Sequence, residues 1–166
     1  MADLKNLMTP YKIGNLTIKN RYCMAPMGGN EHFDYHGAYK DSSVEYYAMR
    51  ARGGFGLLFG GVITPDLEVD PMNPFDGQGG SPLYDSQNWR RQACRLTERV
   101  HAYGGKFIQQ LTLGYGRNYP TLYSCSENEC YAYPMFKSPV LTTDQIRKKV
   151  EQVVKAAVVC QSSEID

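Results

Sequence analysis

The sequence predicts an α/β fold in which parallel strands alternate with crossover helices. Three observations support this prediction: a hairpin pattern near the N-terminus, three short apolar segments, and a helix pattern after each of those segments. The 166 residues are enough for one domain with a buried core. The formal net charge of +1 gives no reason to expect binding to nucleic acid or to an anionic membrane, and no apolar run is long enough to span a bilayer.

The first elements are a hairpin and a short strand. Residues 12–19 alternate apolar and polar side chains around Gly14-Asn15, which predicts a hairpin. The apolar run 22–27 predicts a buried strand that ends at Pro26. We therefore expect the chain to enter the main sheet near residue 22, after the hairpin.

The first helix is expected over residues 42–52. Ser42 and Glu45 have the spacing of a capping box, in which both side chains accept hydrogen bonds from backbone N–H groups of the first turn. Gly53-Gly54 predict a left-handed C-terminal cap, because glycine adopts positive φ at little steric cost.

A second strand–helix unit follows. Segment 56–59 lacks polar–apolar alternation and predicts a strand that is covered on both faces. A long irregular loop, 63–84, leads to a helix expected over 85–103. Its apolar stripe recurs in steps of three and four at Trp89, Ala93, Leu96, Val100 and Tyr103.

The third unit comprises a strand over 106–111 and a helix that begins after a Tyr- and Gly-rich loop, 112–140. Thr142 and Gln145 predict a capping box at the start of this helix. One face of the helix is apolar; it carries Ile146, Val150, Val153, Val154 and Ala157. Three strands are too few to close a barrel, which typically needs about 250 residues.

The candidate site lies at the carboxyl ends of the strands, where parallel α/β folds bind ligands. Residues 25–28 form either a rigid strand end or a flat apolar shelf with exposed backbone groups. Gly61, at the end of the second strand, would let a flat ligand approach the backbone closely. Gln110, at the end of the third, is either a core glutamine with satisfied hydrogen bonds or a ligand contact.

Other polar residues give weaker indications. His32 and His36 follow the first strand and could face the same site, whereas Arg117 is more simply a loop arginine. Cys125 and Cys130 lack the further ligands of a zinc site, so we expect no metal site. No Ser–His–Asp set or catalytic carboxylate pair stands out. The odd number of five cysteines favours reduced thiols, and thus a cytoplasmic location.

Taken together, these segments resemble the old yellow enzyme family, the NADH:flavin oxidoreductases. The matching segments are LTIKNRYCMAPM (16–27), YYAMRARGGFGL (46–57), VHAYGGKF (100–107), Gln110-Leu111 and Gly116-Arg117. A second set is similar to the dienoyl-CoA reductase-like subgroup: SENE (126–129), Pro139 and LTTDQI (141–146).

The resemblance implies the N-terminal portion of an FMN-binding TIM barrel, with an N-terminal hairpin and three βα units. It implies an NAD(P)H oxidoreductase of the ene-reductase type, which takes a hydride from NADH or NADPH and reduces an activated C=C bond in an enone or enoyl-type small molecule. By position, it assigns the flavin contacts to Ala25, Pro26, Met27, Gly28, Gly61, Val62 and Gln110. Gly61 and Val62 depart from the family, which often has an acidic residue followed by a small one there.

In the family, the residues that activate the substrate and bind the FMN phosphate follow the segment equivalent to Asp166. We therefore interpret residues 1–166 as a partial barrel domain that is truncated before strand four. We expect it to contain no catalytic residue, to bind FMN weakly or not at all, and to have little or no activity alone.

Two alternatives stay open. One is a non-catalytic half-barrel fragment that self-associates or complements another fragment; open sheet edges favour it, as would Met24, Leu58 and Ile108 if these side chains point into the barrel. The other is a different barrel enzyme, such as an aldolase or a phosphosugar enzyme. It would need a lysine or paired acids at the strand ends, and the sequence has none at the first three.

Overall fold

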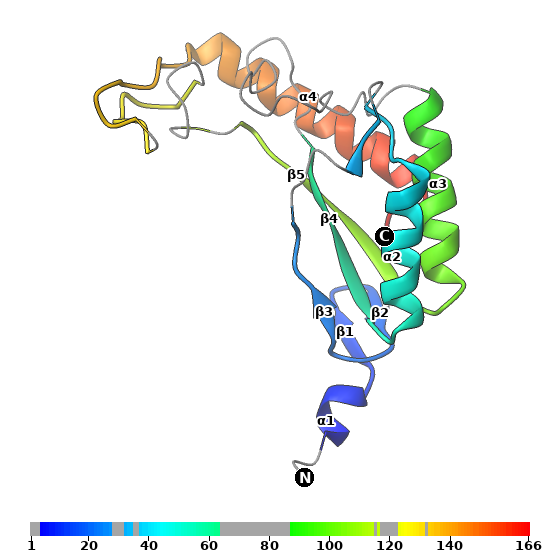
Figure 1. Cartoon of the computed structure of the whole chain (residues 1–166). Coiled ribbons are helices and arrows are strands. Elements are labelled where there is room, and N and C mark those ends of the chain that lie inside the picture. The colour runs from blue at the N-terminus through cyan, green and yellow to red at the C-terminus, as the bar shows by residue number, and fades with distance from the viewer. Residues whose placement is uncertain are drawn as a thin grey trace.

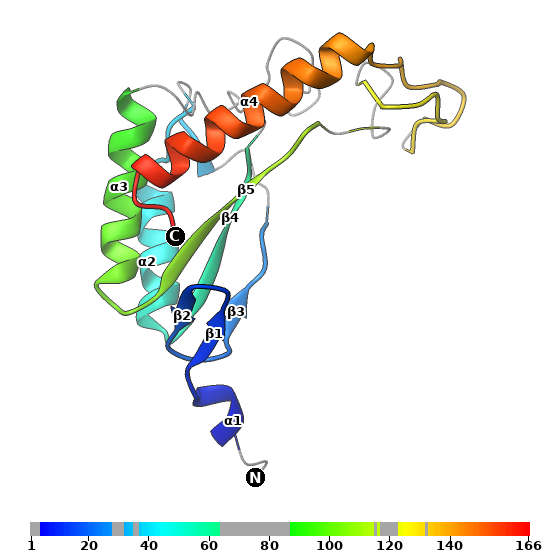
Figure 2. The same cartoon turned by 180° about the vertical axis from the view of Figure 1, so that it is seen from behind.

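The fold consists of a three-stranded parallel sheet with helices on one face and a separate hairpin at its lower end (Figure 1). This computed structural model describes residues 4–27, 32–34, 37–63, 87–114, 116, 123–131 and 133–166. Helices α2 and α3 lie side by side against the sheet, and α4 runs across its upper end (Figures 1 and 2). The prediction of strands alternating with helices is therefore confirmed.

The hairpin is confirmed at the N-terminal side of the sheet. Strands β1 (Tyr11–Ile13) and β2 (Leu16–Ile18) pair antiparallel, and Gly14 has a φ of 57° in the turn between them. A short helix that the sequence analysis did not predict, α1 (Lys5–Met8), precedes the hairpin.

The parallel sheet has the order β3-β4-β5. Strand β3 is only Cys23–Met24, shorter than the expected strand from residue 22 to Pro26. Strand β4 (Leu57–Ile63) is longer than expected and includes both glycines of its carboxyl end, while β5 (Lys106–Leu111) matches the prediction. The glycines Gly60 and Gly61 therefore belong to the strand itself rather than to the loop after it.

The predicted caps of α2 are partly wrong. The helix is Asp41–Arg52, its N-cap is Lys40, and no side chain caps it. Glu45 instead reaches across to α3 and pairs with Arg99 at 2.7 Å. At the other end Gly53 stays right-handed, and only Gly54 adopts positive φ, at 111°.

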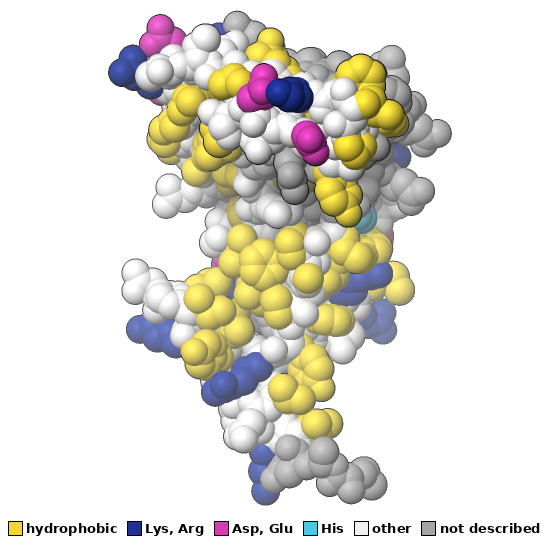
Figure 3. Space-filling model, turned by 90° about the vertical axis from the view of Figure 1, so that its left-hand side faces the viewer, with side chains coloured by type: hydrophobic (Ala, Val, Ile, Leu, Met, Phe, Trp, Pro, Cys, Tyr) yellow, Lys and Arg dark blue, Asp and Glu magenta, His cyan; other side chains and the backbone are white. Residues whose placement is uncertain are grey.

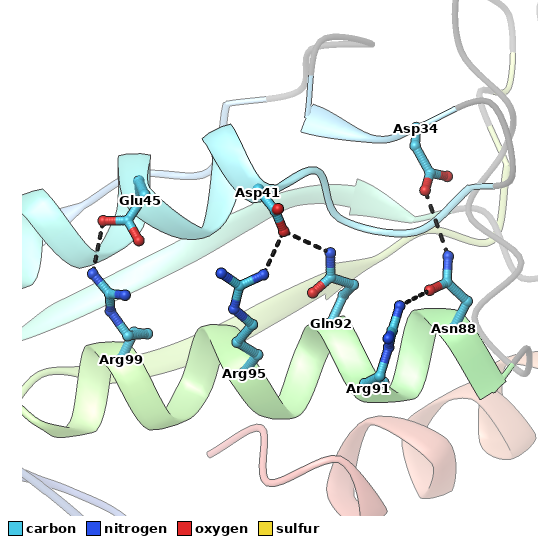
Figure 4. Close-up of polar contacts among 8 residues, drawn as sticks. All are labelled: Asp34, Asp41, Glu45, Asn88, Arg91, Gln92, Arg95 and Arg99. Carbon is cyan, nitrogen blue, oxygen red and sulfur yellow. Dashed lines mark hydrogen bonds and ion pairs between the residues drawn. The ribbon is translucent and has the colours of Figure 1, made fainter.

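Helix α3 (Gln87–His101) packs along α2 through its apolar stripe and through a row of polar contacts (Figure 4). The stripe is buried at Trp89, Ala93, Leu96 and Val100, as expected, but Tyr103 lies past the helix end and is exposed. Asp41 on α2 accepts hydrogen bonds from Gln92 and Arg95 on α3. These polar contacts on the exposed side of the two helices thus fix how α2 and α3 are aligned along each other.

Helix α4 (Thr143–Ser162) begins with the predicted capping box. The hydroxyl of Thr142 accepts from the amide of Gln145, and the Gln145 side chain accepts from the amide of Thr142. The apolar face named from the sequence is not the buried one: the residues against the fold are Lys149, Ala156, Val159 and Cys160. Ile146, Val150, Val154 and Val158 form an exposed stripe, the α4 stripe. Among the described residues, no helix has the length and apolar character needed to cross a membrane.

The core lies between the sheet and helices α2 and α3. Its largest fully buried side chains include Trp89, Tyr39, Tyr47, Phe107 and Leu58. Met24 and Leu58 are register partners and both belong to this core, so the condition that they point into a barrel is not met. Ile108, which follows Phe107 on β5, is only partly buried and lies on the other face of the sheet.

The last residues run along the outer edge of β5. The amide of Asp166 donates to the carbonyl of Phe107 at 3.0 Å, and the amide of Phe107 donates to the Asp166 carboxylate at 2.9 Å. Lys106 and His101 also bind this carboxylate, each at 2.6 Å. Four groups thus fix the segment after α4 against the edge of the sheet.

Candidate functional site

The carboxyl ends of β3, β4 and β5 meet at one edge of the sheet because the strands are parallel. Ala25, Pro26 and Met27 follow β3 and are exposed. Gly61 and Val62 are near the end of β4, and Gln110 is the penultimate residue of β5. The structure therefore brings six of the seven predicted flavin contacts to one edge, while Gly28 lies outside the described residues.

Two adjacent glutamines on β5 differ sharply in environment. Gln109 points toward the helices, is 8% exposed, and has its carboxamide engaged by Tyr39 and two backbone carbonyls. Gln110 points to the opposite face and is exposed, and its side chain forms no hydrogen bond with any described residue. Of the two readings considered for Gln110, a satisfied core glutamine is thus wrong for that residue and describes Gln109.

The pairing of β4 with β5 skips a residue beside the candidate site. Gly60 is opposite Gln109, whereas Ile63 is opposite Leu111, so three steps along β4 match two along β5. This register shift is a β-bulge that contains Gly61 and Val62. Bulges bend a strand and re-aim its groups, and they are common beside active sites.

The face of the sheet that carries Gln110 is apolar, and no helix among the described residues covers it. Phe59 and Ile108 are register partners on this face and both are partly buried. Figure 3 shows this side of the molecule, where hydrophobic side chains gather over the sheet. A flat aromatic ligand would contact an apolar surface there, and the Gln110 carboxamide lies beside that surface, near the carboxyl end of β5.

Of the remaining candidates, only His32 is described, and it does not join this edge. His32 is held within the fold by Ser43 and packs against the rings of Tyr46 and Tyr47. His36 and Arg117 lie outside the described residues. Within the part of the chain that the structure describes, no three His, Cys, Asp or Glu side chains gather as metal ligands.

Sequence reasoning missed two buried polar residues behind the site, Tyr39 and Gln109. Strand parity offered a signal for Gln109, because it shares a face with the apolar Phe107. Tyr39 lies in the loop before α2, where no pattern indicates burial, yet it is 0% exposed. Burial raises the pKa of Tyr39 well above 10, so its hydroxyl keeps its proton; burial also raises the pKa of Tyr47 to about 12.

Comparison with known proteins identifies the family. The sequence profile of the NADH:flavin oxidoreductase / NADH oxidase family matches residues 6–166, nearly the whole chain. The chain belongs to this family. The resemblance stated from the sequence is thus confirmed, and with it membership of a family of oxidoreductases that use FMN.

Curated relatives of this family member are enzymes with several names. The chain is 38% identical to the cinnamate reductase of Clostridium sporogenes over 68% of its length, and 29% identical to the NADH oxidase of Thermoanaerobacter brockii over 100%. It covers 17% and 25% of those proteins, respectively. The chain thus spans a quarter or less of the length of these two relatives.

Solved structures confirm the fold class. A 2-naphthoyl-CoA reductase superimposes with a TM-score of 0.80 at 20% identity, over 98% of this chain and 26% of that protein. An old yellow enzyme homologue from Zymomonas mobilis gives 0.75 at 24%, over 97% of this chain and 46% of the other. The family member therefore has the fold of the N-terminal part of a TIM-barrel flavoprotein.

The edge described above fits the flavin of such a barrel. Gly61 carries no side chain, residues 25–27 are exposed, and the carboxamide of Gln110 has donors and an acceptor to offer. The pyrimidine edge of a flavin displays both donors and acceptors. The chemistry of this edge therefore suits the ring of FMN.

Proposed function

We propose that this chain forms one wall of the FMN site in an ene-reductase-type NAD(P)H oxidoreductase. The observation that carries the proposal is the Gln110 carboxamide. It lies at the carboxyl end of β5, on the open apolar face, with no hydrogen bond to a described residue. A buried ring edge would satisfy this amide, and Gln109 cannot serve because its own amide is already engaged.

Each predicted contact has a distinct task in this proposal. Gln110 reads the pyrimidine edge of the ring, and Ala25, Pro26 and Met27 form the shelf beside it. Gly61 and Val62, in the bulge of β4, let the backbone approach the ring. Bound FMN would supply the hydride transfer itself; the residues named here bind and orient the ring.

The reaction we propose is hydride transfer from NADH or NADPH, through FMN, to an activated C=C bond of an enone or enoyl-type molecule. The similarity to a cinnamate reductase supports this substrate class, since cinnamate carries a C=C bond conjugated to a carboxylate. We propose that the residues that activate the substrate are not among residues 1–166. The five cysteines are free thiols, which supports the cytoplasmic location that we propose.

Binding of two flavins tests the proposal. If the chain contacts the ring but not the phosphate, FMN and riboflavin should bind weakly and with equal affinity, within about twofold, a difference well under 1 kcal/mol. Fluorescence titration of the 166-residue chain measures both affinities. Absence of riboflavin binding would refute the proposal that this chain contacts the flavin ring. FMN that stays stoichiometric through gel filtration would instead show that this chain also holds the phosphate.

A second candidate, a half-barrel that pairs with another copy or with a complementary fragment, is supported by a different observation. Among the described residues, strands β3 and β5 each have one neighbour in the sheet, and the α4 stripe is exposed. Unpaired strand edges and exposed apolar stripes both favour association. We propose that residues 1–166 comprise three βα units of a barrel, and that association covers the surfaces they expose.

A further inference from the structure

A buried hydrogen-bond network lies directly behind the proposed flavin edge. The side-chain amide nitrogen of Gln109 donates to the carbonyl of Gly61, and to the carbonyl of Gln110 at 3.1 Å. The side-chain oxygen of Gln109 accepts from the hydroxyl of Tyr39. We call these groups, the side chains of Tyr39 and Gln109 with the two carbonyls, the Gln109 clamp.

The two carbonyls belong to the residues that the proposed function places against the flavin. Gly61 lies in the bulge of β4, and neither Gly61 nor Val62 has a register partner in β5. Gln110 follows Gln109 on the neighbouring strand. The Gln109 carboxamide is thus hydrogen-bonded to the carboxyl ends of both β4 and β5, where the register between the two strands shifts.

The clamp is rigid because both of its side chains are buried and surrounded. Tyr39 is 0% exposed, and its ring packs against Phe33 at 4.8 Å and Trp89 at 6.3 Å between centroids. Since Tyr39 keeps its proton, its hydroxyl can only donate to the Gln109 oxygen. The two carbonyls can only accept hydrogen bonds, so they hold the amide nitrogen of Gln109 toward them and leave its oxygen facing the Tyr39 hydroxyl.

Gly60 shows how closely the strand approaches the clamp. A Cβ atom at Gly60 would lie 2.8 Å from the Gln109 side-chain oxygen and 3.0 Å from the Tyr39 hydroxyl. Only glycine leaves room for the clamp at this position. The position of the Gln109 amide on β5 therefore depends on the glycine at position 60 of β4.

From this geometry we infer that Tyr39 and Gln109 are positioning residues for the flavin site: they fix the backbone of Gly61 and Gln110 from the side of the sheet that the ring does not touch. The inference rests on the proposed function. A core glutamine with only a structural task could bind any two carbonyls. Here both belong to the proposed ring contacts, and the side chains that supply the bonds face away from the ring.

The test compares variants that lose clamp donors with one that loses a buried hydrogen bond elsewhere. Gln109→Met keeps the length of the side chain but removes both donors, and Tyr39→Phe removes only the hydrogen bond to the amide oxygen. Thr97→Val is the control, because the Thr97 hydroxyl is buried in α3 and bonds only carbonyls of its own helix. All three are made in the 166-residue chain, and circular dichroism checks that each is folded.

Two measurements are made on each variant. The first is the carbonyl ¹³C shift of Gly61 and Gln110 without flavin, which moves upfield when a carbonyl loses a hydrogen bond. The second is riboflavin affinity and the absorption spectrum of the bound ring. We expect Gln109→Met to shift both carbonyls and to weaken riboflavin binding about tenfold, Tyr39→Phe to do so less, and Thr97→Val to do neither.

The outcomes separate this inference from the proposed function. Unchanged carbonyl ¹³C shifts in Gln109→Met would show that Gln109 does not bind these carbonyls, whatever the riboflavin affinity is. Shifted carbonyls with unchanged riboflavin affinity and spectrum would overturn the positioning role. If the unaltered chain binds no riboflavin, the proposed function fails, while the carbonyl shifts still decide whether the clamp exists. If Gln109→Met does not fold, Tyr39→Phe gives the same readings.

Discussion

At the scale of single residues, strand parity separates a ligand contact from a structural residue. Gln109 and Gln110 are identical side chains one step apart, and the pleat of β5 turns them to opposite faces. The Gln109 amide, on the helix side, is hydrogen-bonded to Tyr39 and two backbone carbonyls. The Gln110 amide, on the open face, forms no hydrogen bond with any described residue. The same chemistry therefore stabilises the fold at one position and is available to a ligand at the next.

Replacing Gln110 tests its role as a flavin contact. Gln110→Leu should weaken flavin binding by about 1–3 kcal/mol, because the ring edge would lose its hydrogen-bond partner and stay buried. Stability should change little, since the side chain is exposed in the chain alone. Gln87→Leu, at an exposed position at the start of α3, is the matched control and should leave affinity unchanged. Equal flavin affinity in both variants would remove Gln110 from the site.

Asp166 makes the stability of the chain pH-dependent. Burial alone would raise its pKa, but hydrogen bonds from Lys106, the Phe107 amide and His101 outweigh burial and lower the pKa below 3.8. A lowered pKa in the folded state means that the carboxylate stabilises the fold above pH 3.8, and that this contribution is lost as pH falls through the lower folded value.

We therefore expect Asp166→Asn to cost about 1–2 kcal/mol of unfolding free energy at pH 7, where the charged hydrogen bonds are complete. The gap between variant and unaltered chain should close as the pH falls below 3.8. Urea unfolding at several pH values measures this. Asp144→Asn is the control, because that side chain is 91% exposed and its pair with Arg147 should contribute little. A gap of the same size at all pH values would contradict the assignment.

At the scale of elements, the two predicted capping boxes offer a direct comparison. Thr142 caps α4 as predicted, whereas α2 begins one residue before Ser42, which therefore does not cap it. Thr142→Ala should lower stability by about 0.5–2 kcal/mol, and Ser42→Ala should have almost no effect. Thermal unfolding of the two variants checks this. A similar loss in both would mean that Ser42 also contributes to the start of its helix.

The sequence predicted the existence and order of the helices and strands better than their burial. The apolar stripe of α3 could be predicted, because α2 and the sheet together cover one face of that helix and leave the opposite face to solvent. The burial of α4 could not be predicted, because its apolar stripe stays exposed although Val154 and Val158 border a cavity shared with β5, and its buried face includes Lys149. The bulge at Gly61 and the burial of Tyr39 depend on contacts between distant segments, which no local pattern records.

At the scale of the whole molecule, the described helices cover one side of the sheet and leave the other side open. Helices α2 and α3 bury one face, while Figure 3 shows hydrophobic side chains over the opposite side. The strand order leaves β3 and β5 as edges, and the segment that ends in Asp166 begins to cover β5. Gln110 lies on the open side and residues 25–27 are exposed, so whatever covers that surface also encloses this part of the candidate site.

The exposed apolar surface should make the isolated chain associate. Val154 and Val158 in the α4 stripe are each 59% exposed, and burying a large apolar side chain is worth about 1.5–3 kcal/mol. We expect light scattering to show a mass that rises with concentration. Replacing Val154 and Val158 together by lysine should lower that mass, because charges would then meet across the contact. Met49→Lys is the control: Met49 is 67% exposed but lies on α2, away from the stripe. A chain that stays monomeric at high concentration, unfolds in one sharp transition and binds no apolar dye would show that this surface needs no partner.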